Sequence, residues 1–209
     1  MAIIHHTTLK PTKLELLTAW LPTRPWYAGS GTPELTKAGG FRLDDPEGEV
    51  GIEFMVALDT SGPEPVAYHV PLTYRAAPLP GADQALVGTM EHGVLGPRWA
   101  YDGVHDPVLR TELLALFEGR AQAMAQSISD TPDHEVAHTY AGPALPTGPA
   151  EITEDRDGTD VTLTDGTVLH IHRTLSPTPP DGTSGQISTT WEASNGTRLR
   201  TVFASLRTP

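Results

Sequence analysis

The stretch that decides the fold is YDGVHDPVLRTELLALF, at residues 101–117. Within it, Asp106 is a residue type that caps helix N-termini, and Pro107 suits the first helical turn. Gly119 stands where a helix commonly ends. We therefore predict a helix from Asp106 to Gly119, with an extension through residues 121–125. Its apolar stripe has Leu114 at the edge and comprises Val108, Leu109, Leu113, Leu116 and Phe117.

The sequence before this helix alternates between strand-like runs and turns. Three such runs lie at residues 41–43, 50–58 and 66–74, with Asp-Pro-Glu-Gly and Ser-Gly-Pro-Glu-Pro turns between them. Shorter strand-like runs follow at residues 86–90 and 98–101. Consecutive short strands with tight turns predict an antiparallel meander.

The N-terminal part predicts one short helix and a loop. Thr12 and Glu15 match the capping-box pattern, and apolar residues follow at helical spacing. We predict a helix over residues 12–21 that stops at Pro22. The Gly- and Pro-rich residues 22–40 are then a loop.

The C-terminal part predicts two β-hairpins. One covers residues 160–175 and turns at Asp165-Gly166, and the other covers residues 186–206 and turns at Asn195-Gly196. Both dipeptides are preferred in two-residue hairpin loops.

These elements predict an α+β fold in two parts. Residues 1–141 form an antiparallel meander sheet with one principal helix, and residues 151–209 form a smaller antiparallel β-sheet packed against it. Residues 142–150 (GPALPTGPA) are a Pro- and Gly-rich linker between the two.

Composition excludes several kinds of partner and site. The 209 residues carry 14 basic and 26 acidic side chains, a net charge of −12. Nucleic acids and anionic membranes are bound by clustered Lys and Arg, so we expect neither as a partner. Without cysteine there is no disulfide, thiolate metal site or cysteine nucleophile. No run approaches the ~20 apolar residues of a membrane span, and we expect a cytoplasmic protein without a cofactor.

Residues 134–138 read His-Glu-Val-Ala-His, which matches the H-E-x-x-H pattern of zinc hydrolases. On a helix, His134 and His138 would share one face and bind zinc, while Glu135 would activate the bound water. The context argues against this alternative, because Thr131-Pro132-Asp133 and Gly142-Pro143 leave room for barely two turns. Alternation along the segment is also typical of a strand. We therefore expect no metal site.

His170 and His172 fall on one face of a predicted strand, because side chains alternate with a period of two. Such pairs occur in metal-binding β-barrels. The favoured interpretation is the polar face of an antiparallel sheet, with Leu169 and Ile171 facing the core.

Aromatic residues and one histidine near residues 24–31 and 101–107 suggest either a sugar site or core packing, and core packing is favoured. They are Trp26, Tyr27, Trp99, Tyr101 and His105.

Three short sequence motifs of this chain, which we call the cap phrases, resemble motifs in the N-terminal cap of actinobacterial maltokinases and the related bacterial glucosamine kinases. Residues 24–31 (RPWYAGSG) are similar to a cap phrase R-W-F-x-G-K-G-R, although Ser30 and Thr32 replace its basic residues. Residues 101–107 are similar to V-Y-D-x-x-H-D-P, and residues 70–75 (VPLTYR) to Q-V-P-L-x-x-R. The resemblance covers roughly residues 12–125.

A further stretch, VLHIHRTL at residues 168–175, resembles the kinase N-lobe strand L-L-K-L-F-R-R-L. The resemblance implies that residues 151–209 are a degenerate kinase N-lobe, with His170 at the position of the ATP-contacting lysine. A neutral imidazole cannot replace that ammonium. The sequence contains no H-G-D-x-H-x-x-N catalytic loop.

The resemblance implies a stand-alone, non-catalytic accessory or regulatory protein linked to maltose, trehalose, glycogen or amino-sugar phosphorylation. We expect a protein partner in that metabolism, or self-association through an exposed sheet edge, and no enzyme activity. The alternative is a module that binds a sugar or nucleotide between the two sheets. Residues expected at the ligand or partner surface are Arg24, Trp26, Tyr27, Tyr101, His105, His170 and His172.

Overall fold

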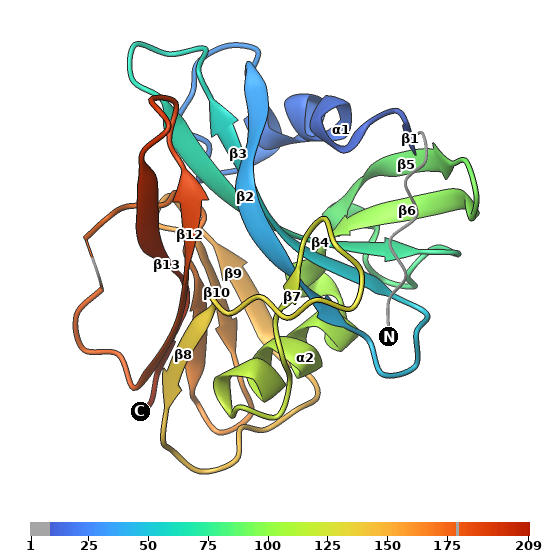
Figure 1. Ribbon diagram of the computed structural model, residues 1–209. Coiled ribbons are helices and arrows are strands. Elements are labelled where there is room, and N and C mark those ends of the chain that lie inside the picture. Colours follow the sequence, from blue (N-terminus) through green and yellow to red (C-terminus); the bar gives the residue numbers. More distant parts are fainter. Residues whose placement is uncertain (1–8, 179) are drawn as a thin grey trace.

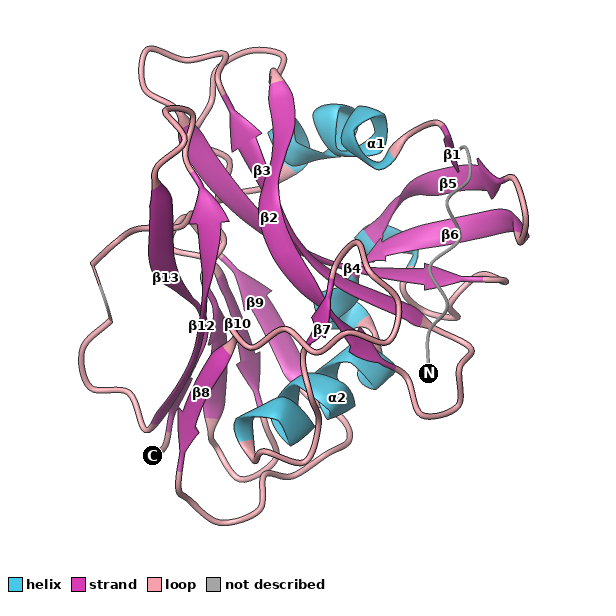
Figure 2. Cartoon of the chain, in the orientation of Figure 1, coloured by secondary structure: helices cyan, strands magenta, loops and turns pink. Residues whose placement is uncertain are grey.

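The computed structural model describes residues 9–178 and 180–209, and its strands greatly outnumber its helices (Figures 1 and 2). The helices are α1 (Lys13–Trp20), α2 (Pro107–Phe117) and three 3₁₀ turns, η1 (Leu21–Thr23), η2 (Asp83–Ala85) and η3 (Gly103–His105). The strands are β1 (Leu9–Lys10), β2 (Leu35–Asp44), β3 (Gly51–Asp59), β4 (Val66–Arg75), β5 (Leu86–His92), β6 (Gly96–Asp102), β7 (Met124–Ala125), β8 (Ala137–Tyr140), β9 (Glu151–Glu154), β10 (Thr159–Thr162), β11 (Val168–Ile171), β12 (Gly185–Glu192) and β13 (Arg198–Arg207). The predicted α+β class with one principal helix is confirmed.

Both predicted helices form, and their caps explain their starts. The Asp106 side chain accepts a hydrogen bond from the Val108 amide at the start of α2. Thr12 caps α1 in a complete capping box with Glu15.

The predicted extension of α2 through residues 121–125 is wrong. Gly119 adopts a φ of 71°, which turns the chain out of the helix. Met124–Ala125 is the short strand β7, paired with β2. Leu114, predicted at the edge of the stripe, is buried.

The meander forms with every predicted strand. β3 lies between β2 and β4, and β6 and β5 continue the sheet beyond β4. The prediction of a loop over residues 22–40 is wrong in its last part, because β2 begins at Leu35.

Gly39 and Gly40 let β2 continue through this glycine-rich stretch. Their φ values are 149° and 126°, and the register with β3 shifts between Lys37 and Gly39. A Cβ on Gly40 would lie 2.0 Å from the Phe54 carbonyl oxygen, so only glycine fits there.

The C-terminal hairpins turn where the Asp-Gly and Asn-Gly pairs predict. β10 pairs with β11, and β12 pairs with β13. Two further strands extend them. β9, which the sequence does not predict, pairs with β10, and β8, where the sequence shows strand-like alternation, pairs with β12.

The two predicted sheet regions are joined edge to edge at two places. Trp191 of β12 pairs with Gly39 of β2. On the other side, the chain after β11 returns to β4: the His69 amide donates to the Arg173 carbonyl at 2.8 Å, and the Leu175 amide donates to the Ala67 carbonyl at 2.9 Å. The path β4-β3-β2-β12-β13-β11 is therefore closed into a ring.

One hydrophobic core spans both regions. Phe41 and Phe54 of the meander stack at 4.5 Å, and Phe203 of β13 packs beside Phe41. The predicted linker also contributes, since Leu145 is buried in this core. A smaller core lies under α1, around Leu17, Trp20 and Trp26 among others.

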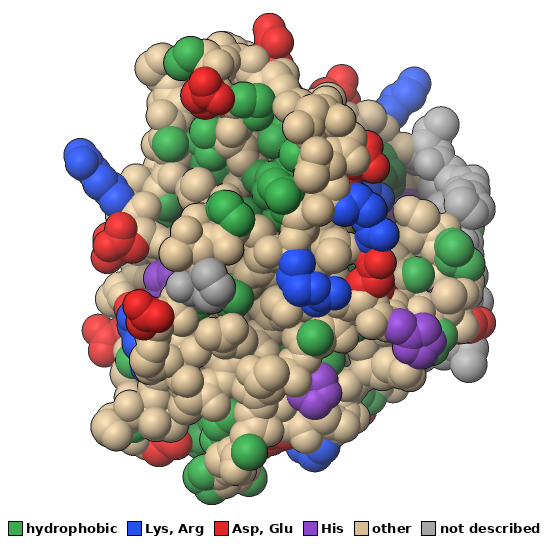
Figure 3. Space-filling view, turned by 60° about the vertical axis from the view of Figure 1, so that its left-hand side comes forward, with side chains coloured by type: hydrophobic (Ala, Val, Ile, Leu, Met, Phe, Trp, Pro, Cys, Tyr) green, Lys and Arg blue, Asp and Glu red, His purple; other side chains and the backbone are tan. Residues whose placement is uncertain are grey.

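The surface carries charges of both signs. On the face that Figure 3 shows, acidic and basic side chains are interspersed. Among the described residues, no helix is long and apolar enough to cross a membrane.

Candidate functional site

A fully buried arginine lies at the junction of the meander and the C-terminal hairpins. Arg173 follows β11, and none of its side chain is exposed. Its Nη2 lies 2.5 Å from Asp102 Oδ2, and its Nε donates to Thr159 Oγ1 at 2.8 Å. The guanidinium also lies over the Trp26 ring, 4.9 Å from its centroid. This contact is a cation–π interaction.

The loop at residues 24–26 reaches the same junction. Trp26 Nε1 donates to Glu154 Oε1 of β9 at 3.1 Å, and Arg24 Nη1 lies 3.6 Å from Glu154 Oε2. Glu154 Oε1 also lies 3.7 Å from Arg173 Nη2. Two arginines therefore face two carboxylates, Asp102 and Glu154. We name these four residues and Trp26 the junction cluster.

The second aspartate of residues 101–107 has a separate structural role. Asp106 is buried and binds Arg75 through both carboxylate oxygens, at 2.6 and 2.8 Å. This hydrogen-bonded carboxylate raises the pKa of Arg75. Because the same carboxylate caps α2, Asp106 ties the helix to the end of β4.

His69 is buried inside the ring of strands beside the junction cluster. Its ring lies 4.4 Å from Phe203, and its Nδ1 donates to the His172 carbonyl at 3.1 Å. Its Nε2 has no hydrogen-bond partner among the described residues. Burial, together with the nearby Arg173 charge, lowers the pKa of His69 to about 3. The imidazole is therefore neutral near pH 7.

The remaining residues predicted at a ligand surface are not brought together. Tyr27 donates to the Gly31 carbonyl at 3.0 Å and so fixes its own loop. Tyr101 is buried in another small cluster, where its hydroxyl accepts from the Leu79 amide at 2.9 Å. His105 lies half-buried in η3. Arg24 and Trp26 lie in the junction cluster.

His170 and His172 lie on the polar face of the C-terminal hairpin, and Leu169 and Ile171 face the core as predicted. Their rings meet edge to face at 4.5 Å. His170 Nδ1 lies 2.5 Å from Asp160 Oδ1, and His172 Nε2 lies 3.0 Å from the Ser205 hydroxyl.

His172 is uncharged near neutral pH. Burial, followed by the nearby His170 and Arg207, lowers the pKa of His172 to about 4. The partners of both histidines, Asp160 and Ser205, belong to the same sheet.

The helical zinc site at residues 134–138 does not form. His134 lies in a turn and His138 in strand β8, so the two are not on one helical face. Glu135 binds Arg198 and the Thr190 hydroxyl instead. Across residues 9–178 and 180–209, no group of three His, Asp or Glu side chains gathers as metal ligands would. The helix on which the zinc hydrolase alternative depends is therefore not formed.

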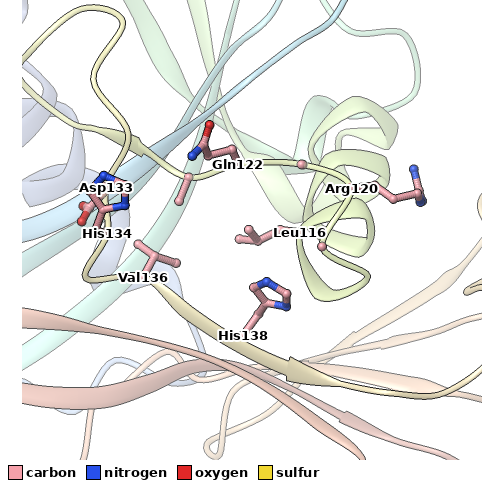
Figure 4. Close-up of a pocket in the computed structure, with 10 residues that line it drawn as sticks. Leu116, Arg120, Gln122, Asp133, His134, Val136 and His138 are labelled. Carbon is pink, nitrogen blue, oxygen red and sulfur yellow. The ribbon is translucent and has the colours of Figure 1, made fainter.

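A surface hollow of about 470 Å³ lies between this segment and the end of α2 (Figure 4). Val136 and His138 line one side, and Leu116 and Gly119 line the other. The sequence singles out residues 134–138 only for the H-E-x-x-H pattern and for a strand-like alternation. No local pattern pairs them with the end of α2, so sequence reasoning misses the hollow.

The comparison with known families gives one match. Residues 20–106, less than half of the chain, match the maltokinase N-terminal cap domain. Over these residues the chain is similar to that domain, and we refer to residues 20–106 as the cap-like domain. No curated protein matches the chain.

The cap-like domain supplies only part of the junction cluster. Arg24, Trp26 and Asp102 lie inside the matched residues, whereas Glu154 and Arg173 lie beyond them. The cap phrases at residues 24–31 and 101–107 therefore dock the cap-like domain against the C-terminal hairpins. The sequence places Arg24 and Trp26 at a ligand or partner surface and favours core packing for Trp26. It does not identify Glu154 or Arg173 as their partners, because no local pattern connects them.

Proposed function

We propose that this cap-like protein is a non-catalytic accessory or regulatory protein that acts through a protein partner. The observation that carries this proposal is that residues of the cap phrases form structural contacts within the chain. Asp102 and Trp26 bind residues of the C-terminal region, and Asp106 caps α2 and binds Arg75. Residues committed to such contacts build a scaffold and are not left to act on a substrate.

The absence of kinase chemistry from the sequence also supports a non-catalytic role. Phosphoryl transfer needs a phosphate cradle, metal ligands and a positioned base together. The 209 residues contain no H-G-D-x-H-x-x-N loop, and His170, aligned with the N-lobe lysine, is bound to Asp160.

The proposed metabolic setting is the phosphorylation of maltose, trehalose, glycogen-derived sugars or amino sugars. It rests on the relation to maltokinase caps. A cytoplasmic location is part of the proposal, and a chain without cysteine is compatible with a reducing compartment.

The proposal is tested by adding increasing amounts of the purified chain to a purified maltokinase and following ADP release. We expect a saturable change in the rate or in the KM for maltose, with a complex visible by analytical ultracentrifugation. An unrelated protein of similar size and net charge is the control. Unchanged kinetics and no complex at micromolar concentrations of both proteins would contradict the proposal.

A small-molecule binding module is the second candidate function. The hollow at the end of α2 favours it, because its volume of about 470 Å³ falls within the usual range for ligand sites. Core side chains of both regions pack between the two sheets, so we place the proposed ligand in the hollow.

A further inference from the structure

We propose that the hollow between the end of α2 and residues 133–138 binds a small neutral polyol, such as a monosaccharide or disaccharide. One wall is the chain that leaves α2, residues 116–123, and the other is the segment that enters β8 (Figure 4). The inference rests on the proposed non-catalytic function, because the hollow is assigned a ligand but no reaction.

Backbone hydrogen bonds fix both walls before any ligand arrives. The amides of Arg120 and Ala121 both donate to the Ala115 carbonyl, at 2.8 and 3.1 Å. The Asp133 amide donates to the Ala123 carbonyl at 2.8 Å and so ties the second wall to the first. β8 is paired along its length with β12. A wall held in this way loses little conformational freedom on binding.

His138 connects the two walls and presents one nitrogen toward the hollow. Its Nδ1 donates to the Phe117 carbonyl, 3.2 Å away at the end of α2. In the neutral ring, Nε2 is then an acceptor. Figure 4 shows this ring turned toward Leu116. Gly119 leaves room for it, since a Cβ there would lie 3.2 Å from His138 Cε1.

The lining combines an aliphatic surface with hydrogen-bonding groups of both kinds. Leu116 and Ala123 are buried, and Val136 is half-buried, so they form an apolar floor. Polar side chains surround this floor, with Gln122 and His134 exposed at its edge. The polar lining residues are Arg120, Gln122, Asp133, His134 and His138.

The charges of the lining favour a neutral ligand. The Arg120 guanidinium is already paired with Glu118. Asp133 adds a carboxylate, whose Oδ1 accepts from the Glu135 amide at 3.0 Å. An anionic ligand would therefore find the Arg120 charge already neutralised by Glu118, and the Asp133 carboxylate would repel it. A polyol instead offers hydroxyls that both donate and accept, together with C–H surface for the apolar floor.

The test is an NMR titration of the ¹⁵N-labelled full chain with glucose, maltose, trehalose and inositol, and separately with potassium phosphate. We expect at least one polyol to cause saturable shifts in the amides of residues 119–123 and 133–138. Removing one hydrogen-bonding side chain by Gln122→Ala or His134→Ala should weaken that binding about fivefold. The matched variant Gln84→Ala, an exposed glutamine in η2, should bind as the wild type does.

Three outcomes would overturn the inference. They are the absence of saturable shifts in these amides with all four polyols, a response to phosphate alone, and unchanged polyol affinity in both hollow variants. None of these outcomes bears on the maltokinase titration described above. Failure of the ligand site is thus distinguishable from failure of the accessory function.

Discussion

At the scale of single residues, the charged residues of the cap phrases hold the fold together through pairs whose partners cannot be predicted from the sequence. Asp102 and Arg173 are 71 positions apart, yet they form a buried ion pair. Local patterns do predict Asp106 as a cap. The alternation that turns Leu169 and Ile171 toward the core also places Arg173 on that face, but no local pattern identifies Asp102 as its partner.

Replacing Arg173 with Met should reduce the free energy of unfolding by about 3–5 kcal/mol, because Asp102 would remain buried without its cation. Urea unfolding followed by circular dichroism measures this change. The double variant Asp102→Leu/Arg173→Met should recover part of the loss, since an apolar pair of similar volume leaves no unpaired charge.

Arg207→Met is the matched control for that experiment. Arg207 pairs with Asp160 at 3.2 Å on the surface, with 51% of its own side chain exposed. The expected loss is at most about 1 kcal/mol. Equal losses in the Arg173 and Arg207 variants would show that the buried pair has no special role.

The buried histidines predict that the protein becomes less stable in mild acid. The folded-state pKa values of His69 and His172 are about 3 and about 4, both below the ordinary value of 6.5. Between pH 6.5 and 4, the unfolded chain therefore binds more protons than the folded chain. Stability is fully present above pH 6.5 and falls as the pH is lowered through this window.

Unfolding free energies measured by urea titration at pH 7.5, 6.0 and 5.0 test this direction. His69→Phe should roughly halve the slope, because it removes one of the two depressed groups. His134→Phe, at an exposed position, should leave the slope unchanged. A wild-type stability that is level or rises on acidification over this range would contradict the burial of neutral imidazoles.

At the scale of elements, the sequence predicts what is encoded locally. The caps of α1 and α2 and the Asp-Gly and Asn-Gly turns each lie within a few residues of what they determine. β9 and the start of β2 depend on partners elsewhere in the chain. Gly39 and Gly40 predict a loop by composition. In the structure, their conformational freedom allows β2 to pair with β3 as an irregular strand.

Gly40→Ala should destabilise the protein much more than Gly48→Ala. Both glycines have positive φ values, 126° and 74°, so both variants carry backbone strain. Only at Gly40 would the new Cβ also meet backbone, 2.0 Å from the Phe54 carbonyl oxygen; around Gly48 the space is open.

We expect about 1 kcal/mol for Gly48→Ala and at least twice that for Gly40→Ala. Thermal and urea melts of the two variants provide the comparison. Similar melting temperatures would mean that β2 does not approach β3 as described.

At the scale of the whole molecule, closure of the strands makes the meander and the C-terminal hairpins depend on each other. Residues 173–175 return to β4, and β12 meets β2, so the core contains side chains from both regions. This closure and the hollow beside α2 arise from segments distant in sequence. For that reason neither could be predicted from local patterns, although both sheets and the principal helix could.

The shared core predicts that the two regions unfold together. Tryptophan fluorescence reports on both regions, because Trp26 packs under α1 and Trp191 lies in β12. Its urea transition should coincide with the loss of far-UV circular dichroism. Two separated transitions would indicate that residues 151–209 unfold as an independent domain.

The central proposal is that the cap phrases build a scaffold and do not form a reaction centre. The most direct measurement is ADP release by the chain alone, supplied with magnesium, ATP and, in turn, maltose, trehalose and glucosamine. The account predicts no turnover above the rate without protein at any concentration of the chain. Turnover that increases in proportion to the concentration of the chain and produces the phosphorylated sugar would contradict it.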